Sequence, residues 1–168
     1  MSAGNINKDS IFSIHPVGYV QASESDGQFA IKVFPEYCAA LKKLDQFSHV
    51  VIFWWADRHD IPHDSNITVA NLPYAEGIEA GVFACRSEYR PNPIAMTVMQ
   101  ILHIDEKNGL ILLPWIDAFD GTPVIDLKPY MPVSDRIRDV KVADWLKDWP
   151  LWMEEAGEYF ATHQTNFG

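Results

Sequence analysis

The feature that most constrains the fold is an uninterrupted run of β-forming apolar residues, His49–Trp55 (HVVIFWW). A run of this length favours a strand over a helix, and its continuous apolarity indicates a strand buried on both faces. The segment that follows, Asp57–Leu72, is polar and rich in turn formers, so we expect a surface loop there. The chain is therefore expected to build a sheet around this strand.

Further short β-forming runs are separated by Pro, Gly and Asp, and Asn108-Gly109 between two of them predicts a hairpin because both residues tolerate positive φ. Pro35-Glu36 predicts the start of a short helix. Strands without intervening long helices indicate a mainly β protein, either an antiparallel barrel or a sandwich. The other predicted strands are Ile11–Gln21, Gln28–Phe34, Gly77–Cys85, Ala95–Ile104, Leu110–Phe119 and Val124–Leu127.

The length of 168 residues fits one domain. We expect a flexible polar N-terminus over residues 1–10, a barrel domain over 11–139 and a C-terminal helical extension over 140–168. The extension shows two short helical patterns, Val142–Trp149 and Leu151–His163. Its aromatic residues are expected to pack on the barrel or on a partner subunit.

The net charge of −10 disfavours polyanions, because binding to a phosphate backbone depends on Lys and Arg displacing counterions. An RNA substrate would require a local basic patch, although the same residues could belong to an ordinary mixed surface. The candidate patch comprises Arg86, Arg90, Lys128, Arg136, Arg138 and Lys141.

The two cysteines, Cys38 and Cys85, have neither disulfide-framework nor zinc-ligand spacing, and His59 and His63 complete no metal motif. We therefore expect no metal. The N-terminus has no apolar signal core, and no apolar run reaches the roughly 20 residues that span a bilayer. These patterns predict a protein that is unexported, without a membrane span, and cytoplasmic.

The segment Arg90–Ile94 (RPNPI) is stiff, because two prolines hold Asn92 in an extended conformation. With Arg86 and Arg90 it could present carbonyls and positive charge to an adenine edge and a carboxylate. It could equally be a rigid connection whose arginines form surface ion pairs.

The turn Asp120-Gly121-Thr122-Pro123 leads into a strand in which Asp126, Lys128 and Tyr130 share one face if the alternation of period two holds. These side chains could hold the amino-acid end of a zwitterionic ligand. A structural ion pair is the competing interpretation.

Taken together, three motifs resemble the TsaA-like (TrmO) family, in a short form without the C-terminal domain of longer members. The motifs are Gly81–Ser87 (GVFACRS), Arg90–Ile94, and Asp120–Tyr130 (DGTPVIDLKPY), with Pro35-Glu36-Tyr37 and Phe47-Ser48-His49 preceding them in order. The resemblance covers residues 14–135.

The resemblance implies a single antiparallel β-barrel that binds S-adenosyl-L-methionine, forms a homodimer with sites near the subunit interface, and transfers a methyl group. Its expected acceptor is the exocyclic amine of threonylcarbamoyl-adenosine beside a tRNA anticodon. The alternatives are a small-molecule or other acceptor, or cofactor binding without catalysis. No catalytic residue is assigned. The implied cofactor residues are Arg86, Met96, Ala56, Asp57, Asp117, Phe119, Asp120, Gly121 and Thr122, and the motif members Arg90, Asn92, Asp126, Lys128 and Tyr130.

Several positions depart from the family pattern. The acidic stretch Ser23–Gln28 stands where a Pro-Arg-Gln segment is usual, and Ala56-Asp57 stands where the family often has His with a polar or basic residue. Glu88 follows Ser87 where a proline is usual, and Ala95 replaces a common glycine. These departures bear on the methyl acceptor more than on the methyl donor.

Overall fold

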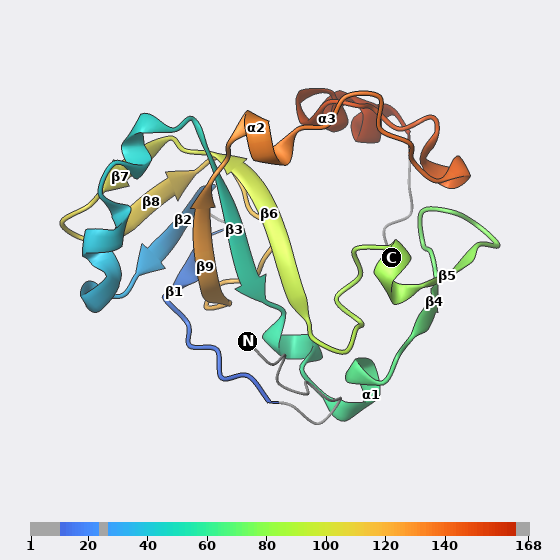
Figure 1. Ribbon diagram of the computed structural model, residues 1–168, viewed down its shortest axis with the longest axis horizontal. Helices are drawn as coiled ribbons and strands as arrows, with labels where there is room; N and C mark the ends of the chain where they lie inside the picture. The colour runs from blue at the N-terminus through green and yellow to red at the C-terminus, as the bar shows by residue number, and fades with distance from the viewer. Residues whose placement is uncertain (1–10, 24–26, 164–168) are drawn as a thin grey trace, which may run out of the picture. The chain divides into compact units, whose positions relative to one another are not determined.

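The computed structural model describes residues 11–23 and 27–163 (Figure 1). The predicted flexible residues 1–10 and part of the acidic stretch, residues 24–26, lie outside this description. The chain divides into two compact units, each assembled from two chain segments. We call residues 1–57 with 94–130 the sheet unit, and residues 58–93 with 131–168 the loop unit.

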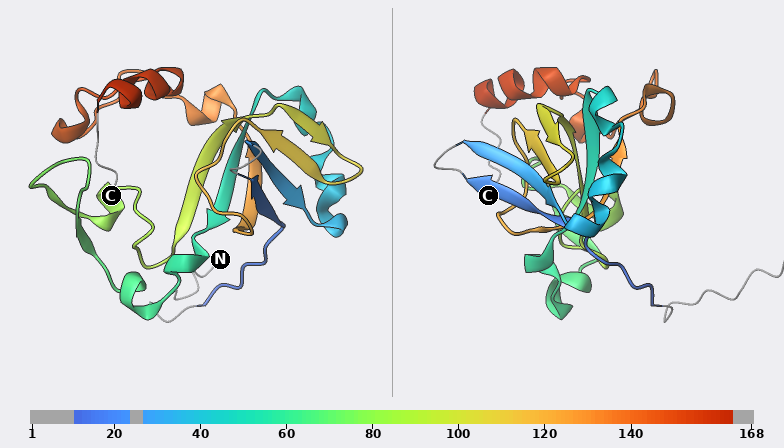
Figure 2. Two further views of the ribbon diagram at one scale, coloured as in Figure 1. Left: turned by 180° about the vertical axis from the view of Figure 1, so that it is seen from behind. Right: turned by 90° about the vertical axis from the view of Figure 1, so that its left-hand side faces the viewer.

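The sheet unit contains a seven-stranded antiparallel sheet with the strand order β6-β3-β9-β1-β2-β8-β7 (Figures 1 and 2). The His49–Trp55 run is strand β3, with the predicted bounds, and β6 and β9 lie on either side of it. The elements of this unit are β1 (Gly18–Ser23), β2 (Gln28–Val33), the 3-10 helices η1 (Pro35–Leu41) and η2 (Leu44–Gln46), β3 (His49–Trp55), β6 (Ile94–Gln100), β7 (His103–Asp105), β8 (Leu110–Leu113) and β9 (Pro123–Pro129).

The mainly β, antiparallel fold is confirmed, but closure into a barrel is not. Strands β6 and β7 are the two edges of the sheet, and no hydrogen-bonded ladder joins them within the described residues. The predicted helix after the second strand is the 3-10 helix η1, and the Asn108-Gly109 hairpin connects β7 to β8. Gly109 adopts φ +65° there, and a Cβ at this position would come within 2.7 Å of the Cys38 sulfur.

Several strand bounds differ from the prediction for identifiable reasons. Strand β8 ends at Leu113 because the next residue, Pro114, has no N–H for the ladder. The predicted strand Ala95–Ile104 is split into β6 and β7, and strand β1 begins only at Gly18.

The core of the sheet unit consists of aliphatic side chains from both halves of the sheet. Ile31, Ile52 and Ile111 are fully buried at its centre. This burial is the main source of stability in the unit, at about 25 cal/mol per Å² of apolar surface. The full cluster is Val20, Ile31, Val33, Leu41, Leu44, Val50, Ile52, Met99, Ile111, Leu113, Ile116 and Val124.

The loop unit holds short elements joined by irregular chain. The predicted strand Gly77–Cys85 is a strand only over Glu79–Gly81, which pairs with Val69–Asn71 in a separate two-stranded sheet. The predicted loop Asp57–Leu72 therefore contains some regular structure. The elements are η3 (Asp57–His59, which begins at the last residue of the sheet unit), α1 (Pro62–Ser65), β4 (Val69–Asn71), β5 (Glu79–Gly81), η4 (Val82–Ala84), α2 (Pro132–Asp135), η5 (Asp144–Leu146) and α3 (Met153–Thr162).

The two C-terminal helical patterns correspond to the single turn η5 and the longer α3. The predicted boundary between residues 139 and 140 stays a prediction. Among the described residues, no helix is both long and apolar enough to cross a bilayer.

Candidate functional site

Three chain segments with predicted site residues meet at one end of the sheet. Strands β6 and β9 both run antiparallel to β3, so the end of β3 lies beside the starts of the other two. The pairs Trp55–Ile94 and Trp54–Val124 fix this register. Ala56 and Asp57 leave β3 at this end, and the 117–122 segment enters β9 there. The topology therefore brings together predicted residues that are far apart in sequence.

The 117–122 segment is pinned to strand β1 by backbone and side-chain hydrogen bonds. The Gly121 N–H donates to the Val20 carbonyl at 2.9 Å, and the Val20 N–H donates to the Thr122 carbonyl at 2.9 Å. Asp120 accepts the Ala22 N–H on Oδ1 at 3.0 Å. Gly121 has φ +81°, which a residue with a side chain adopts only at a cost. These hydrogen bonds hold the turn in one conformation, and one oxygen of the Asp120 carboxylate, Oδ1, contributes to them.

One face of the sheet presents Met96, Phe53 and Asp126 in a row across three strands. Phe53 is the register partner of both Met96 on β6 and Asp126 on β9. Directly paired residues on antiparallel strands have Cβ atoms about 4.5–5.5 Å apart. Sequence reasoning identified Met96 and Asp126 but missed Phe53, which the alternation along β3 places between them.

Asp126 and Lys128 share this face, as the alternation predicts, and form an ion pair. The Lys128 Nζ also lies 5.7 Å from the centroid of the Phe53 ring. Asp126 Oδ1 accepts the N–H of Leu127 at 2.9 Å. Tyr130 packs the edge of its ring against His49, with centroids 6.2 Å apart. The structural ion pair considered for Asp126 and Lys128 is therefore present.

The loop unit contains the three remaining predicted residues, Arg86, Arg90 and Asn92. Arg90 donates to three backbone carbonyls of its own loop. Its Nε reaches the Ser87 oxygen at 2.6 Å, and its Nη2 reaches the oxygens of Val82 and Cys85 at 3.0 and 2.7 Å. These three carbonyls precede the Arg90–Ile94 segment, so Arg90 closes the 82–90 loop on itself, and the contacts of its guanidinium are those of a rigid connection.

Arg86, by contrast, is exposed and has no hydrogen bond or ion pair with any residue in the described part of the chain. Asn92 is also exposed, whereas its neighbour Pro93 is almost completely buried. The difference between the two arginines was not visible in the sequence, where both flank the same motif.

A second polar cluster lies in the loop unit around Asp64, which is buried. His59 Nδ1 and His63 Nδ1 each lie 2.9 Å from one of its oxygens. The hydrogen bond from His63 and then that from His59 lower the pKa of the Asp64 carboxyl. His59 also lies 3.7 Å from a Glu88 oxygen and packs against Tyr89. Across the described residues no group of His, Cys, Asp or Glu has an arrangement able to hold a metal ion.

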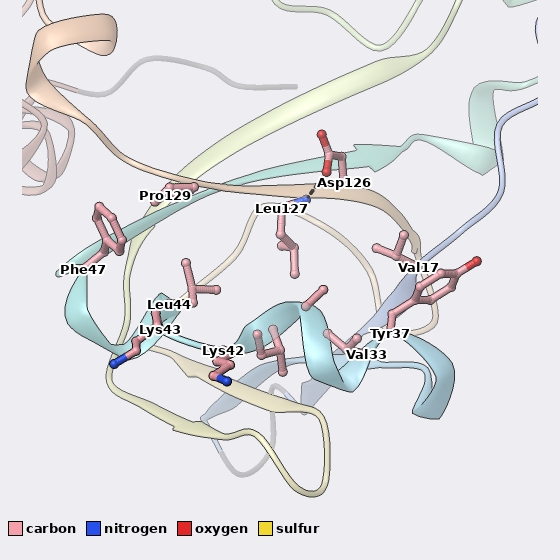
Figure 3. Close-up of a pocket in the computed structure, with 12 residues that line it drawn as sticks. Val17, Val33, Tyr37, Lys42, Lys43, Leu44, Phe47, Asp126, Leu127 and Pro129 are labelled. Carbon is pink, nitrogen blue, oxygen red and sulfur yellow. Dashed lines mark hydrogen bonds between the residues drawn. The ribbon is translucent and has the colours of Figure 1, made fainter.

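The described residues of the sheet unit form cavities that include two beside the predicted site residues, and neither of these coincides with the row of Met96, Phe53 and Asp126. One, of about 250 Å³, is mainly apolar and includes Asp126 in its wall, with the carboxylate turned away from the Leu127 side chain (Figure 3). The other, of about 460 Å³, includes Asp120. The first is lined by Val17, Val33, Tyr37, Ala40, Leu41, Lys42, Lys43, Leu44, Phe47, Asp126, Leu127 and Pro129. The second is lined by Gln21, Ala22, Ser23, Gln28, Ala30, Leu110, Leu112 and Asp120.

Residues 17–136, which include the converging segments and the Arg90 loop, match the tRNA-methyltransferase O N-terminal domain. The chain belongs to this family. The match includes the three motifs on which the resemblance rests.

Relatives of this family member carry two kinds of name. An S-adenosyl-L-methionine-binding protein of Archaeoglobus fulgidus is 37% identical over 121 residues, covering 72% of the chain and 82% of the relative. The tRNA (adenine(37)-N6)-methyltransferase of Homo sapiens is 33% identical over 142 residues, covering 74% of the chain and 31% of the relative. The chain therefore spans about a third of the human enzyme.

Solved structures share the fold. TrmO from Pseudomonas aeruginosa superposes with a TM-score of 0.60 at 26% identity, covering 80% of this chain and 63% of that one. The family member described here therefore spans a little under two thirds of that structure.

Proposed function

We propose that the chain is an S-adenosyl-L-methionine-dependent methyltransferase whose cofactor site includes the end of the sheet where β3, β6 and β9 converge. The observation that carries this proposal is the convergence of Ala56-Asp57, Met96 and the 117–122 turn at one end of the sheet. The family membership and the names of the relatives support it.

The residues present fit the chemistry of this cofactor, which combines a sulfonium cation, an α-amino acid and an adenine ring. Exposed Asp57 and half-buried Asp126 are anionic groups suited to its positive charges, and the exposed guanidinium of Arg86 suits its carboxylate. The proposed cofactor residues remain Arg86, Met96, Ala56, Asp57, Asp117, Phe119, Asp120, Gly121, Thr122, Arg90, Asn92, Asp126, Lys128 and Tyr130.

The contributions of these residues to the reaction differ. The bound cofactor supplies an electrophilic methyl group, and transfer to an amine requires in-line placement and exclusion of water but no covalent enzyme intermediate. The pinned 117–122 turn provides fixed placement. We propose that Arg90 acts indirectly, by closing the loop that carries Arg86.

We propose the exocyclic amine of threonylcarbamoyl-adenosine next to the tRNA anticodon as the acceptor. The name of the human relative supports an adenine in tRNA. Five of the six residues of the candidate basic patch lie in the loop unit, namely Arg86, Arg90, Arg136, Arg138 and Lys141, and the sixth, Lys128, lies in the sheet unit. A second candidate acceptor is a small molecule, which the net charge of −10 favours because an acidic chain repels RNA. Binding of the cofactor without catalysis is a third possibility.

We also propose that the protein is a cytoplasmic homodimer. The edge strand β6 supports association, because Ile94–Gln100 contains no charged residue and no proline, the usual protections of an exposed edge. Light scattering in solution tests this part, and a monomer at micromolar concentration would contradict it.

Calorimetric titration with S-adenosyl-L-methionine tests the cofactor site. Arg86→Ala is expected to weaken binding by about 1.5–3 kcal/mol, the range for a charge-assisted hydrogen bond. Lys147→Ala, an exposed residue in the same unit, is the matched control and should bind like the parent. Absence of binding by the parent protein at millimolar cofactor would reject the methyltransferase and the binding-protein proposals together.

Nucleoside analysis of tRNA from a deletion strain and its parent tests the acceptor. Loss of methylated threonylcarbamoyl-adenosine in the deletion strain supports the tRNA proposal. An unchanged level, together with cofactor binding by the purified protein, rejects tRNA and leaves the small-molecule acceptor or a binding role.

A further inference from the structure

Phe53 occupies the centre of the row in which Met96 and Asp126 are its direct neighbours across β6 and β9. Its side chain is half-buried on the sheet face opposite the core residues Val50 and Ile52. The face of an aromatic ring carries partial negative charge and attracts cations. An aromatic face beside a carboxylate is therefore a place that favours positive charge.

A cation already occupies this place. The Lys128 Nζ lies 5.7 Å from the Phe53 ring centroid and forms an ion pair with Asp126. The side chains of Lys128 and Asp126 are 59% and 48% exposed, respectively. Exposed ion pairs contribute at most about 1 kcal/mol, so a competing cation can open this one at little cost.

This inference rests on the proposed function. We propose that Phe53 and Asp126 form the subsite for the sulfonium of the methyl donor, and that Lys128 fills this subsite in the free protein. Among the proposed cofactor residues, Lys128 is then the one that the donor displaces. Phe53 is then a specificity-determining residue that distinguishes the charged donor from its uncharged product.

The change of charge during the reaction should favour binding of the donor before transfer and release of the product after it. The bond between sulfur and the methyl carbon breaks as a new bond forms to the acceptor nitrogen. The sulfonium becomes a neutral thioether, and the acceptor nitrogen loses a proton to solvent water. A neutral thioether no longer competes with Lys128 for Phe53 and Asp126. The return of Lys128 then favours release of S-adenosylhomocysteine.

Calorimetric titration with S-adenosylmethionine and S-adenosylhomocysteine in parallel tests the subsite. The two ligands share the adenine, the ribose and the α-amino acid and differ in the charge on sulfur. Phe53→Leu is expected to weaken binding of the sulfonium ligand about 3- to 30-fold and that of the thioether less than twofold. Phe53→Trp should keep the preference for the sulfonium ligand over the thioether, because the tryptophan ring can still face the cation.

Lys128→Met removes the competing cation and should strengthen sulfonium binding by about two- to fivefold. Phe12→Leu makes the same substitution as Phe53→Leu at a side chain that is 72% exposed in the sheet unit, and serves as the control. Thermal unfolding confirms that each variant is folded before its affinities are compared.

Three outcomes would overturn the subsite. Equal weakening of both ligands by Phe53→Leu would show that the ring only packs against the donor. Equal weakening of both by Lys128→Met would show that Lys128 binds the carboxylate of the donor. Unchanged sulfonium binding in both variants would place the sulfur elsewhere. These outcomes differ from the result expected if the proposed function is wrong, because the unsubstituted protein would then bind neither ligand.

Discussion

The sheet unit and the loop unit are stabilised by different kinds of interaction. All twelve residues of the aliphatic core cluster belong to the sheet unit. The loop unit combines aromatic contacts of Trp149 with Tyr74 and Phe160 with specific polar contacts, which include those of Arg90 with three carbonyls and of Asp64 with two histidines. Burial of apolar surface is non-directional, whereas a hydrogen bond is lost when one partner is removed. Different kinds of substitution should therefore destabilise the two units.

Ile52→Ala should cause the largest loss of stability, and this loss should affect the whole sheet unit. Ile52 is fully buried in strand β3, so the substitution leaves a cavity and is expected to lower the free energy of unfolding by about 2–5 kcal/mol. Urea denaturation measures this. Ile11→Ala, at a side chain that is 93% exposed, should change the stability by less than about 0.5 kcal/mol.

Arg90→Ala should act locally in the loop unit. Loss of the charged donor leaves the carbonyls of Val82, Cys85 and Ser87 without this partner, at a local cost of about 1.5–3 kcal/mol. Hydrogen exchange over residues 82–90 should accelerate while the protection of β3 persists. Arg86→Ala should leave exchange unchanged, and loss of protection in β3 by Arg90→Ala would remove the distinction between the units.

Asp120→Ala should have a smaller effect within the sheet unit, because it removes one exposed hydrogen bond to the Ala22 N–H. We expect a loss of about 0.5–1.5 kcal/mol in the free energy of unfolding. Asp120→Asn keeps an acceptor oxygen and should recover most of the loss. Equal loss in both variants would indicate that charge rather than the hydrogen bond holds the turn.

The smallest effect should appear in acid, at the Asp64 cluster of the loop unit. Hydrogen bonds from His63 and His59 hold the pKa of Asp64 below its ordinary value of 3.8. The stabilisation by this carboxylate is therefore fully present above that value and is lost as the pH falls through the lower, folded pKa. Exchange of residues 58–68 should accelerate in this range, and Asp64→Asn should flatten the dependence. A steeper dependence in the variant would contradict the assignment.

The same contrast explains what could be predicted from the sequence. Strand β3 was predicted with its observed bounds because a short continuous run of β-forming apolar residues favours a strand. The predicted burial on both faces holds only at Val50, Val51 and Ile52, and the residues from Phe53 onward are half-buried. The alternation along β9 correctly placed Asp126 and Lys128 on one face. Closure of the sheet could not be predicted, because an open sheet and a barrel share the same alternation.

Residues whose roles depend on tertiary contacts were not identifiable. Arg86 and Arg90 flank one motif, yet only Arg90 is bound to its own loop. Phe53 was one apolar residue within an apolar run until the register placed it between Met96 and Asp126. The spacing of His59, His63 and Asp64 matches no metal motif and gives no sign of a shared carboxylate. The candidate site itself rested on resemblance, and the fourteen cofactor residues stay predictions.

The two-segment construction of each unit has a consequence for synthesis on the ribosome. Strand β3 emerges with residue 55, but its neighbour β9 is complete only at residue 129. At about 5–20 residues per second, roughly 4–15 s separate the two events. During this interval the most apolar strand of the chain is without one of its partners. The nascent chain should therefore engage chaperones at the HVVIFWW run before the sheet can form.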